Sequence, residues 1–416
     1  MAVLQLLGME WRPEASHEGP REAGIGQRRG CCDRVPRAWG ARIPLRGRNF
    51  PAEGTAPPCA VAFRVVAPCS APQKLHTPPC PTAEFRLITH VVQMSSEFDI
   101  IQRYFTRPSP GAVLGVGDDA ALIKPARGME LAVSTDMLVA GQHFFADADP
   151  RKLGHKSLAV NLSDMAAMGA RPRWATLSLA LPELMVRTDE KWLAAFADGF
   201  FGLAHAHQVD LVGGDTTRGP LNISVTIIGE VATGKALRRS GATPGDDIWI
   251  SGHLGDAALA LAHAQRRIVL EPGEITECVS ALHTPVVRVE LGQRLIGLAG
   301  SAIDISDGLL ADLGHILKSS KVAAVIKMSE IKCSTAMKRY LPQALAMECL
   351  LAGGDDYELC FTVPRSRRGK IETLSSEQQI PLTRIGRISE GEGLVVLDAA
   401  GNTVTLETKG YDHFHD

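Results

Sequence analysis

The segment 151–169 constrains the fold of this 416-residue chain more than any other stretch. Its apolar residues recur every three or four positions, which predicts a helix that Gly169 closes as a C-cap. The second half of this helix is apolar on nearly every side, apart from Asn161, Ser163 and Asp164. A helix of this kind has to be buried, and a buried carboxylate needs a partner. The fold must therefore supply a partner for Asp164.

Strand-like and helical segments alternate along the chain on both sides of this helix. Residues 221–231 place an apolar side chain at every second position, as a half-buried strand does. The alternation predicts an α/β (α+β) protein in which helices cover mixed sheets in two domains, 94–240 and 241–416. Strands are predicted at 112–114, 130–134, 175–181, 209–212, 221–231, 247–250, 302–305, 322–327 and 357–363. Helices are predicted at 96–106, 151–169, 188–206, 257–265, 286–299, 308–318 and 334–352.

Residues 1–93 differ in composition from the remainder. They hold 12 of the 25 prolines and 5 of the 9 cysteines, and they sustain neither a helical nor a strand period. A segment of this composition struggles to offset its chain entropy by burial. Acidic residues such as Glu10 and Glu14 argue against a targeting peptide, and the adjacent pair Cys31-Cys32 lacks a metal-ligand spacing. We expect 1–93 to be disordered or non-native, and we hypothesise that translation starts at Met94.

The overall composition is that of a soluble protein. The formal net charge of -2 gives no reason to expect a nucleic-acid partner, and no run of about 18 apolar residues predicts a membrane span. The four cysteines after residue 93 are scattered, and none has a ligand spacing: Cys278, Cys333, Cys349 and Cys360. We expect them to be buried thiols in a reducing cytoplasm.

Five clusters of acidic residues stand beside glycine, serine or threonine. Each is expected at the end of a strand or on the face of a nearly apolar element. The first lies in Gly115–Ala121, where two adjacent carboxylates follow a Gly-x-Gly, and like charges side by side need a cation between them. The clusters are Asp118 with Asp119, Asp136, Asp164, Asp215, and Asp304 with Asp307.

Carboxylates that converge without Lys or Arg in their motifs repel a phosphate unless metal ions bridge them. Oxygen-only ligand sets suit Mg²⁺, which binds through one or two carboxylates together with substrate phosphates. Zinc would require Cys and His at short spacing. The acid clusters therefore predict a polyphosphate held by several Mg²⁺ ions, and phosphoryl transfer by positioning and charge neutralisation.

Other interpretations of these motifs are weaker. Each acid could cap a separate helix or turn, but five clusters with one pattern make this a poor explanation. Residues 229–236 resemble a phosphate-binding P-loop, yet Ala236 replaces the hydroxyl residue that would hold Mg²⁺, so a strand-to-loop transition is expected. No Gly-x-Ser-x-Gly elbow predicts a serine nucleophile.

Taken together, these motifs resemble the thiamine-monophosphate kinase family of the aminoimidazole-ribonucleotide-synthetase-like superfamily. The resemblance runs from about Met94 to the C-terminus, and residues 1–93 match nothing in the family. The superfamily shares the Gly-Asp motifs, whereas the stretches around His143 and Tyr411 point to this member. The matching stretches are Gly115–Ala121, Ser134–Asp136, Gly141–Phe144, Asn161–Ala170, Gly213–Thr217, Arg239–Ala242, Ser251–Ala257, Ile303–Gly308, Gly353–Phe361 and Gly410–Phe414.

The resemblance implies ATP-dependent phosphorylation of thiamine monophosphate to thiamine diphosphate by a cytoplasmic homodimer, with ATP as co-substrate and several Mg²⁺ ions. It implies direct in-line transfer without a general base, in which Asp136 and Asp215 matter most. The implied Mg²⁺ ligands are Asp119, Ser134, Thr135, Asp136, Asp164, Asp215, Asp304 and Asp307. The implied ATP contacts are Gly214, Asp215, Arg239 and Ser306, and the implied substrate contacts are His143, Asp355 and Tyr411. Asp355 departs from the family, in which Glu is common, but it keeps the charge.

Another ATP-using enzyme of the same superfamily is the alternative, either an aminoimidazole ribonucleotide synthetase or a selenophosphate synthetase. The second type is expected to carry a reactive Cys in a Gly-rich loop before the first acid motif. The first cysteine after residue 93 is Cys278, far beyond that motif. A non-catalytic regulator that binds Mg²⁺ and nucleotide would tend to have lost some of the acids, and this chain keeps all of them.

Overall fold

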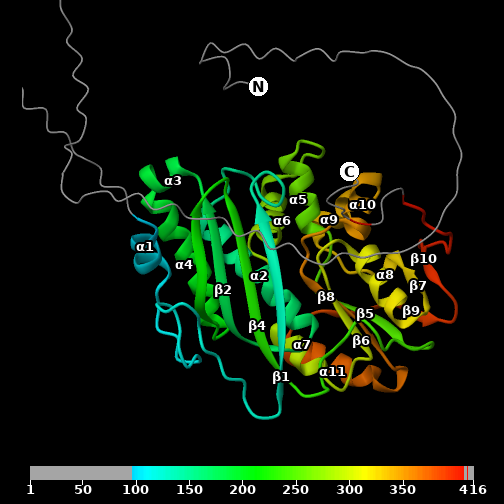
Figure 1. Cartoon of the computed structure of the whole chain (residues 1–416). Coiled ribbons are helices and arrows are strands. Elements are labelled where there is room, and N and C mark those ends of the chain that lie inside the picture. Colours follow the sequence, from blue (N-terminus) through cyan, green and yellow to red (C-terminus); the bar gives the residue numbers. More distant parts are fainter. Residues whose placement is uncertain (1–95, 407–409, 411–416) are drawn as a thin grey trace, which may run out of the picture. The chain divides into compact units, whose positions relative to one another are not determined.

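Two sheets organise the computed structural model, which describes residues 96–406 and Gly410 (Figure 1). Their strand orders are β1-β4-β2-β3 and β10-β7-β9-β5-β8-β6. The first sheet consists of β1 (Met129–Val139), β2 (Arg171–Leu181), β3 (Asp210–Arg218) and β4 (Asn222–Ala232). The second consists of β5 (Asp247–Ser251), β6 (Ser301–Ile305), β7 (Ala323–Lys327), β8 (Glu358–Val363), β9 (Leu382–Ser389) and β10 (Gly393–Leu397).

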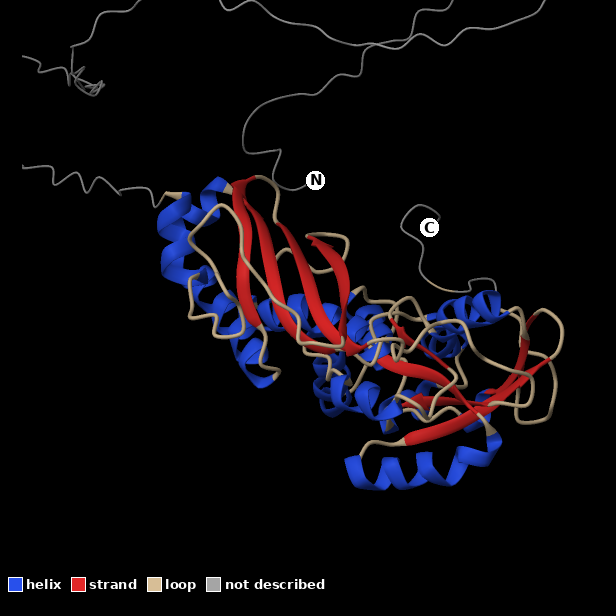
Figure 2. Ribbon diagram, turned by 60° about the horizontal axis from the view of Figure 1, so that its bottom comes forward, coloured by secondary structure: helices blue, strands red, loops and turns tan. Residues whose placement is uncertain are grey.

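Helices pack against both sheets, and Figure 2 shows them along one side of the four long strands. The helices before β5 are α1 (Glu97–Ile100), which continues into the π-helical turn η2 (Ile101–Phe105), α2 (Pro150–Ala167), α3 (Glu183–Thr188) and α4 (Glu190–Ala206). The later helices are α5 (Asp256–Ala264), α6 (Pro272–His283), α7 (Val289–Leu295), α8 (Leu309–Ser320), α9 (Thr335–Tyr340), α10 (Ala344–Ala352) and α11 (Arg368–Gln378). Two 3-10 turns complete the set, η3 (Met328–Glu330) and η4 (Arg365–Arg367).

The two faces of the first sheet differ in character. β4 pairs antiparallel with β1 and with β2, and β3 pairs parallel with β2. On the face that α2 covers, Leu138, Ile223 and Leu179 lie in register and are buried. Because successive side chains of a strand point to opposite faces, Val133 and Met137 lie on the other face, and both are exposed.

The second sheet has a buried centre. Every residue of β5, β6 and β8 is buried, and β8 lies between the other two strands. β6 carries Asp304 and leads through a short loop into α8, which packs back against β6. This connection positions Ser306 and Asp307 at the end of a rigid strand.

Several predictions from the sequence are confirmed. The helix at 151–169 exists as α2, most of its residues are buried, and Gly169 follows it with a left-handed φ of 67°. Ser96 caps the first helix, since its hydroxyl accepts the N–H of Asp99 at 3.1 Å. The four cysteines after residue 93 are buried free thiols. The segment around Ala236 runs from the end of β4 into a turn, as expected of a strand-to-loop transition.

Other predictions are wrong. Residues 112–114 form no strand: a single bridge joins Leu114 to Leu122, and Val113 is 69% exposed. The predicted helix 188–206 does exist, as α4 capped by Asp189, but the short helix α3 before it was not expected. Asp136 and Asp215 lie inside β1 and β3, and not at strand ends. Helices α6 and α11 were not expected.

Some predictions concern features that the structure leaves open. Residues 1–93 and Tyr411 lie outside the described residues, and the division into domains at 240/241 stays a prediction. Between Ser96 and Leu406, no helix is long and apolar enough to cross a membrane.

Candidate active site

One cavity of about 1060 Å³ gathers most of the predicted site residues. Its walls come from β1 and the loop after it, from α2, α5 and α10, from the end of β6, and from the loop before β8. The predicted residues in its lining are Thr135, Asp136, His143, Asp164, Asp304, Ser306, Asp307 and Asp355. Gly410 also lines it, directly before Tyr411.

Four carboxylates form what we term the acid cluster: Asp136, Asp164, Asp304 and Asp307. They come from β1, from α2, from β6 and from the loop that follows β6. Two hydroxyls hold members of the cluster in place: Ser134 donates to Asp164 at 2.5 Å, and Ser163 donates to Asp304 at 2.8 Å. The partner that Asp164 requires is thus a group of further carboxylates and hydroxyls.

The acid cluster is electrostatically unfavourable without a cation. Burial, followed by the charges of Asp164 and Asp304, raises the pKa of Asp136 to about 7. Burial and the Asp164 charge likewise raise the pKa of Asp304 to about 7. The exposed Arg239 lies close enough to lower the pKa of Asp164 and that of Asp304, but this effect is smaller than that of burial.

The donor set of the cluster fits Mg²⁺, because carboxylate and hydroxyl oxygens are the ligands of hard cations. Among residues 96–406, no group of three or more His, Cys, Asp or Glu side chains is arranged as a finished metal site. Mg²⁺ does not require one, since it is commonly held by one or two carboxylates together with water and substrate phosphates. The cluster is therefore suited to ions that arrive with a phosphate ligand.

The loop between β6 and α8 is held by a residue that the motif analysis missed. One oxygen of Asp312 accepts the N–H groups of Ser306, Asp307 and Gly308 at 3.0, 3.1 and 3.1 Å. Gly308 has a φ of 113°, and a Cβ there would lie 2.7 Å from the backbone of Ala352. The only sequence signal for Asp312 was its place in the first turn of the predicted helix, where carboxylates are common.

The loop before β8 presents Asp355 to the cavity in a constrained backbone. Asp355 has a φ of 71° and Tyr357 a φ of 50°, a region that residues other than glycine seldom adopt. Lys156 Nζ donates to Asp355 Oδ2 at 3.0 Å, and the Tyr357 hydroxyl donates to Asp355 Oδ1 at 2.9 Å. Lys156 was also missed, although a lysine entering so apolar a helix was a possible signal.

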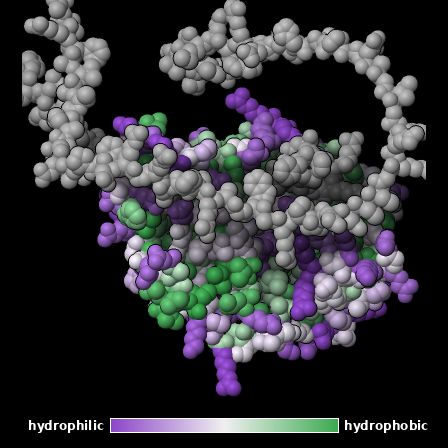
Figure 3. All heavy atoms as spheres, in the orientation of Figure 1, coloured by the Kyte–Doolittle hydropathy of each residue, from purple (hydrophilic) through white to green (hydrophobic). Residues whose placement is uncertain are grey.

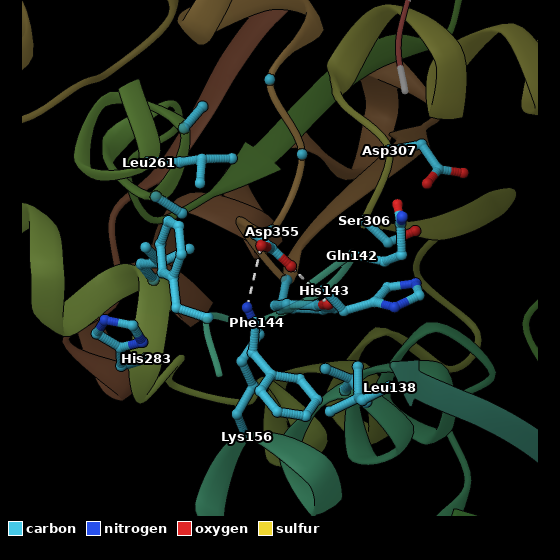
Figure 4. Close-up of a pocket in the computed structure, with 18 of the residues that line it drawn as sticks. Leu138, Gln142, His143, Phe144, Lys156, Leu261, His283, Ser306, Asp307 and Asp355 are labelled. Atoms are coloured by element: carbon cyan, nitrogen blue, oxygen red, sulfur yellow. Dashed lines mark hydrogen bonds and ion pairs between the residues drawn. The ribbon is translucent and has the colours of Figure 1, made fainter. Parts of the chain in front are cut away.

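His143 lies in the turn after β1 and projects into the same cavity (Figure 4). Its Nδ1 accepts the N–H of Val139 at 3.0 Å. The neutral ring therefore carries its proton on Nε2, which makes that nitrogen a hydrogen-bond donor. Gln142 and Phe144 flank it in the lining.

Other predicted residues lie away from the acid cluster. Asp119 is exposed in a loop, where Asp118 shapes the turn by accepting the N–H of Asp119 at 2.9 Å. Asp215 pairs with Ser178 on the face of the first sheet opposite α2, the face that also carries Thr135. The role predicted for these residues as Mg²⁺ ligands stays a prediction.

Gly214 has a separate structural reason to be glycine. Its φ is 147°, and a Cβ there would lie 1.8 Å from the backbone oxygen of Leu177 in β2. The strand pair β2–β3 therefore tolerates no side chain at this position, whatever else Gly214 contacts.

Comparison with known proteins places these features in a family. Residues 117–231 match the family described as AIR synthase related protein, N-terminal domain. Thiamine-monophosphate kinase of Escherichia coli (strain K12) is 46% identical over 323 residues, which cover 76% of this chain and 98% of that protein.

Solved structures agree with this relationship. A crystal structure of thiamine-monophosphate kinase from Stenotrophomonas maltophilia K279a has a TM-score of 0.66 at 46% identity, and covers 73% of this chain and 95% of that one. A structure described as AaThiL complexed with AMPPCP and TMP has a TM-score of 0.61 at 30% identity, and covers 76% of this chain and 96% of that one. With such identity over nearly the whole length of its relatives, the chain belongs to the thiamine-monophosphate kinase family.

Proposed function

We propose that this protein transfers the γ-phosphoryl group of ATP to the phosphate of thiamine monophosphate, yielding ADP and thiamine diphosphate. The observation that carries the proposal is one cavity that joins the acid cluster to Asp355. A substrate with a phosphate at one end and an aminopyrimidine at the other would use both parts of such a cavity. The names of the relatives and the AMPPCP and TMP of the AaThiL complex support the same reaction.

The chemistry requires no general base. An oxygen of the substrate phosphate attacks the γ-phosphorus, a P–O bond forms, and the bond to the β–γ bridging oxygen breaks so that ADP leaves with the electron pair. A phosphate dianion is already a nucleophile at neutral pH. His143, protonated on Nε2, is suited to donate to a substrate oxygen and to fix its direction.

Charge is the main obstacle, because two anions must meet beside several carboxylates. Bound Mg²⁺ neutralises charge on the phosphates. The ligands that we assign to it are Asp119, Ser134, Thr135, Asp136, Asp164, Asp215, Asp304 and Asp307. The ATP contacts that we assign are Gly214, Asp215, Arg239 and Ser306, and Tyr411 joins His143 and Asp355 as a substrate contact. We place the reaction in the cytoplasm, where the buried thiols stay reduced.

A second copy of the chain is the partner that we assign to the uncovered face of the first sheet. Val133 is 62% exposed and Met137 55%, although both lie in β1, which pairs along its whole length with β4. Figure 3 shows hydrophobic residues gathered over this sheet on the face seen in Figure 1. An apolar sheet face rimmed by polar groups is typical of a protein–protein interface.

A homodimer would also explain where Asp215 lies. β1 and β3 are the two edge strands of the first sheet, so three strand spacings, about 14 Å, separate them. A second copy whose β3 lies beside β1 would cover both edges. It would also bring the strand that carries Asp215 of the partner subunit to the sheet edge that carries Asp136. We infer that each site uses residues of both copies.

A product assay tests the proposed reaction. The full chain and the chain beginning at Met94 are incubated with Mg-ATP and thiamine monophosphate, and thiamine diphosphate is separated by chromatography. We expect thiamine diphosphate and ADP in equal amounts from both. Absence of this product, with turnover of an aminoimidazole ribonucleotide precursor or of selenide instead, would reassign the enzyme within its superfamily.

A further inference from the structure

Lys156 is a buried ammonium group inside the cavity. It is 3% exposed, and Figure 4 shows its side chain extending from α2 to Asp355. Among the described residues, the one hydrogen bond of its Nζ runs to Asp355 Oδ2 at 3.0 Å. An ammonium has three N–H donors, and a buried polar group that lacks acceptors is costly. Two donors of Lys156 are thus available to a ligand in the cavity.

Asp355 beside it keeps acceptor capacity. Each carboxylate oxygen can accept about two hydrogen bonds, and Lys156 and the Tyr357 hydroxyl use one on each. The backbone fixes the carboxylate in place, because the Asp355 N–H donates to Ser306 O at 2.9 Å and the Tyr357 N–H donates to Ile305 O at 2.8 Å. The pair therefore presents a donor and an acceptor side by side, both held in position.

We propose that Lys156 and Asp355 together recognise the edge of the substrate's aminopyrimidine, an inference that rests on the proposed function. The exocyclic 4′-amino group of thiamine is a donor, and the adjacent ring nitrogen N3′ is an acceptor. The amino group donates to Asp355, and Lys156 donates to N3′. A carbonyl in place of the amino group reverses this pattern, so the pair selects against such an analogue.

The position of Lys156 along α2 favours a role at the ring over one at the phosphate. Lys156, Val160 and Asp164 follow each other at intervals of four residues, and all three line the cavity. Eight residues of helix span about 12 Å, so Lys156 lies roughly that far along the helix from the acid cluster. Val160 places an apolar side chain between the two charged ends. α2 thus separates a site for the phosphate from a site for the ring.

The test compares the kinetics of two substrates in the wild type and in variants of two lysines. The substrates are thiamine monophosphate and oxythiamine monophosphate, whose 4′-amino group is replaced by a carbonyl. We expect the wild type to prefer the amino form in kcat/KM by about 100-fold or more. In Lys156→Met, KM for thiamine monophosphate should rise about 10- to 100-fold and the preference should shrink, while KM for ATP stays unchanged. Lys191→Met, which changes an exposed lysine of α4 outside the cavity lining, is the control and should retain both values.

The outcomes separate this inference from the proposed function. If the wild type forms no thiamine diphosphate, the proposed function fails and this inference falls with it. If the wild type forms it and folded Lys156→Met keeps the wild-type KM and preference, the inference alone is overturned. Should Lys156→Met not fold because Asp355 is left unpaired, Lys156→Met/Asp355→Asn removes both charges. That variant should have lost the preference, and retention of it would equally contradict the proposal.

Discussion

At the scale of single residues, the site is built on charges that oppose folding. Asp136 and Asp304 have pKa values of about 7, above the ordinary 3.8 of a carboxyl, because they are buried beside each other and Asp164. The folded chain therefore binds these protons more tightly than the unfolded chain does. Because of these two groups, the free energy of unfolding of the metal-free protein falls as the pH rises from about 4 to about 7. Bound Mg²⁺ should offset this loss.

The affinity for Mg²⁺ should accordingly depend on pH. Protons must leave Asp136 and Asp304 before the carboxylates bind a cation, so we expect the apparent affinity to rise up to about 10-fold per pH unit for each proton released below pH 7. Above that pH it should level off. Isothermal titration calorimetry at several pH values, in buffers of different ionisation enthalpy, counts the protons. An affinity that does not change between about pH 6 and pH 8 would show that these carboxylates do not bind the ion.

Asp312 should act on catalysis through the loop that it holds. Asp312→Ala leaves three N–H groups of residues 306–308 without their acceptor, which should cost about 1–3 kcal/mol of unfolding free energy. We also expect KM for Mg-ATP to rise about 10-fold, because Ser306 and Asp307 lose their fixed position. Asp312→Asn retains an acceptor oxygen and should lie between this variant and the wild type. A destabilised variant with an unchanged KM would limit Asp312 to a structural role.

The acidic residues of the site could be predicted from the sequence more readily than the residues that hold site side chains in position. Asp136, Asp164 and Asp304 carry a local pattern of glycine, serine or threonine beside an acid, and the structure brings them together. Lys156 lies 199 positions before Asp355, and no local pattern joins two such residues. Their contact depends on how α2 packs beside the loop before β8, which only the tertiary structure defines.

At the scale of elements, strongly periodic segments were predictable and weakly periodic ones were not. α2 carries apolar side chains every three or four residues and was found almost residue for residue. α11 has a polar sequence in which only Ile371 and Leu374 are buried, so it offers little periodicity. α6 was missed despite Pro272 at its first turn and a Glu271–Glu274 capping box, which were the available signals.

The contact between α2 and α4 permits a sharp test at this scale. A Cβ on Gly154 would lie 2.0 Å from the backbone oxygen of Phe196, so Gly154→Ala should push the helices apart and destabilise the protein by about 2–4 kcal/mol. Gly202 in α4 has nothing within 4 Å of its added Cβ. Gly202→Ala should therefore stabilise by about 0.5–1 kcal/mol through helix propensity alone. Equal effects of the two variants in denaturant titrations would contradict the close packing of α2 on α4.

At the scale of the whole molecule, the proposed site requires two copies of the chain. The first sheet has two open edges and one apolar exposed face, and these features could be read from the structure but not from the sequence. Successive side chains of β1 point to opposite faces of the sheet, yet the sequence does not say which face a helix covers. The position of Asp215 on the face away from α2 likewise follows from strand register.

The interface predicts a simple effect on assembly. Val133→Asp places a charge on the apolar face and should raise the dimer dissociation constant at least about 10-fold, as measured by analytical ultracentrifugation. Val269 is 79% exposed outside the first sheet, so Val269→Asp is a matched control that should leave the dimer intact. A wild-type chain that is monomeric at micromolar concentration would remove the basis of this prediction.

Subunit mixing tests whether a site draws on both copies. Asp136→Ala and Asp215→Ala should each lower turnover by orders of magnitude while the fold is retained. If each site combines Asp136 of one copy with Asp215 of the partner subunit, mixed dimers keep one intact site of two. Unfolding and refolding the two variants together should then restore about a quarter of wild-type activity. No recovery, with mixed dimers demonstrated by differential tagging, would mean that Asp215 acts within its own chain or not at all.

Direct transfer of the γ-phosphoryl group to thiamine monophosphate can be followed with ATP labelled in that group during a single turnover. Direct transfer predicts that the label appears in the terminal phosphate of thiamine diphosphate, in equal amount with ADP. Label released as inorganic phosphate with thiamine monophosphate unchanged, or formation of AMP, would contradict it.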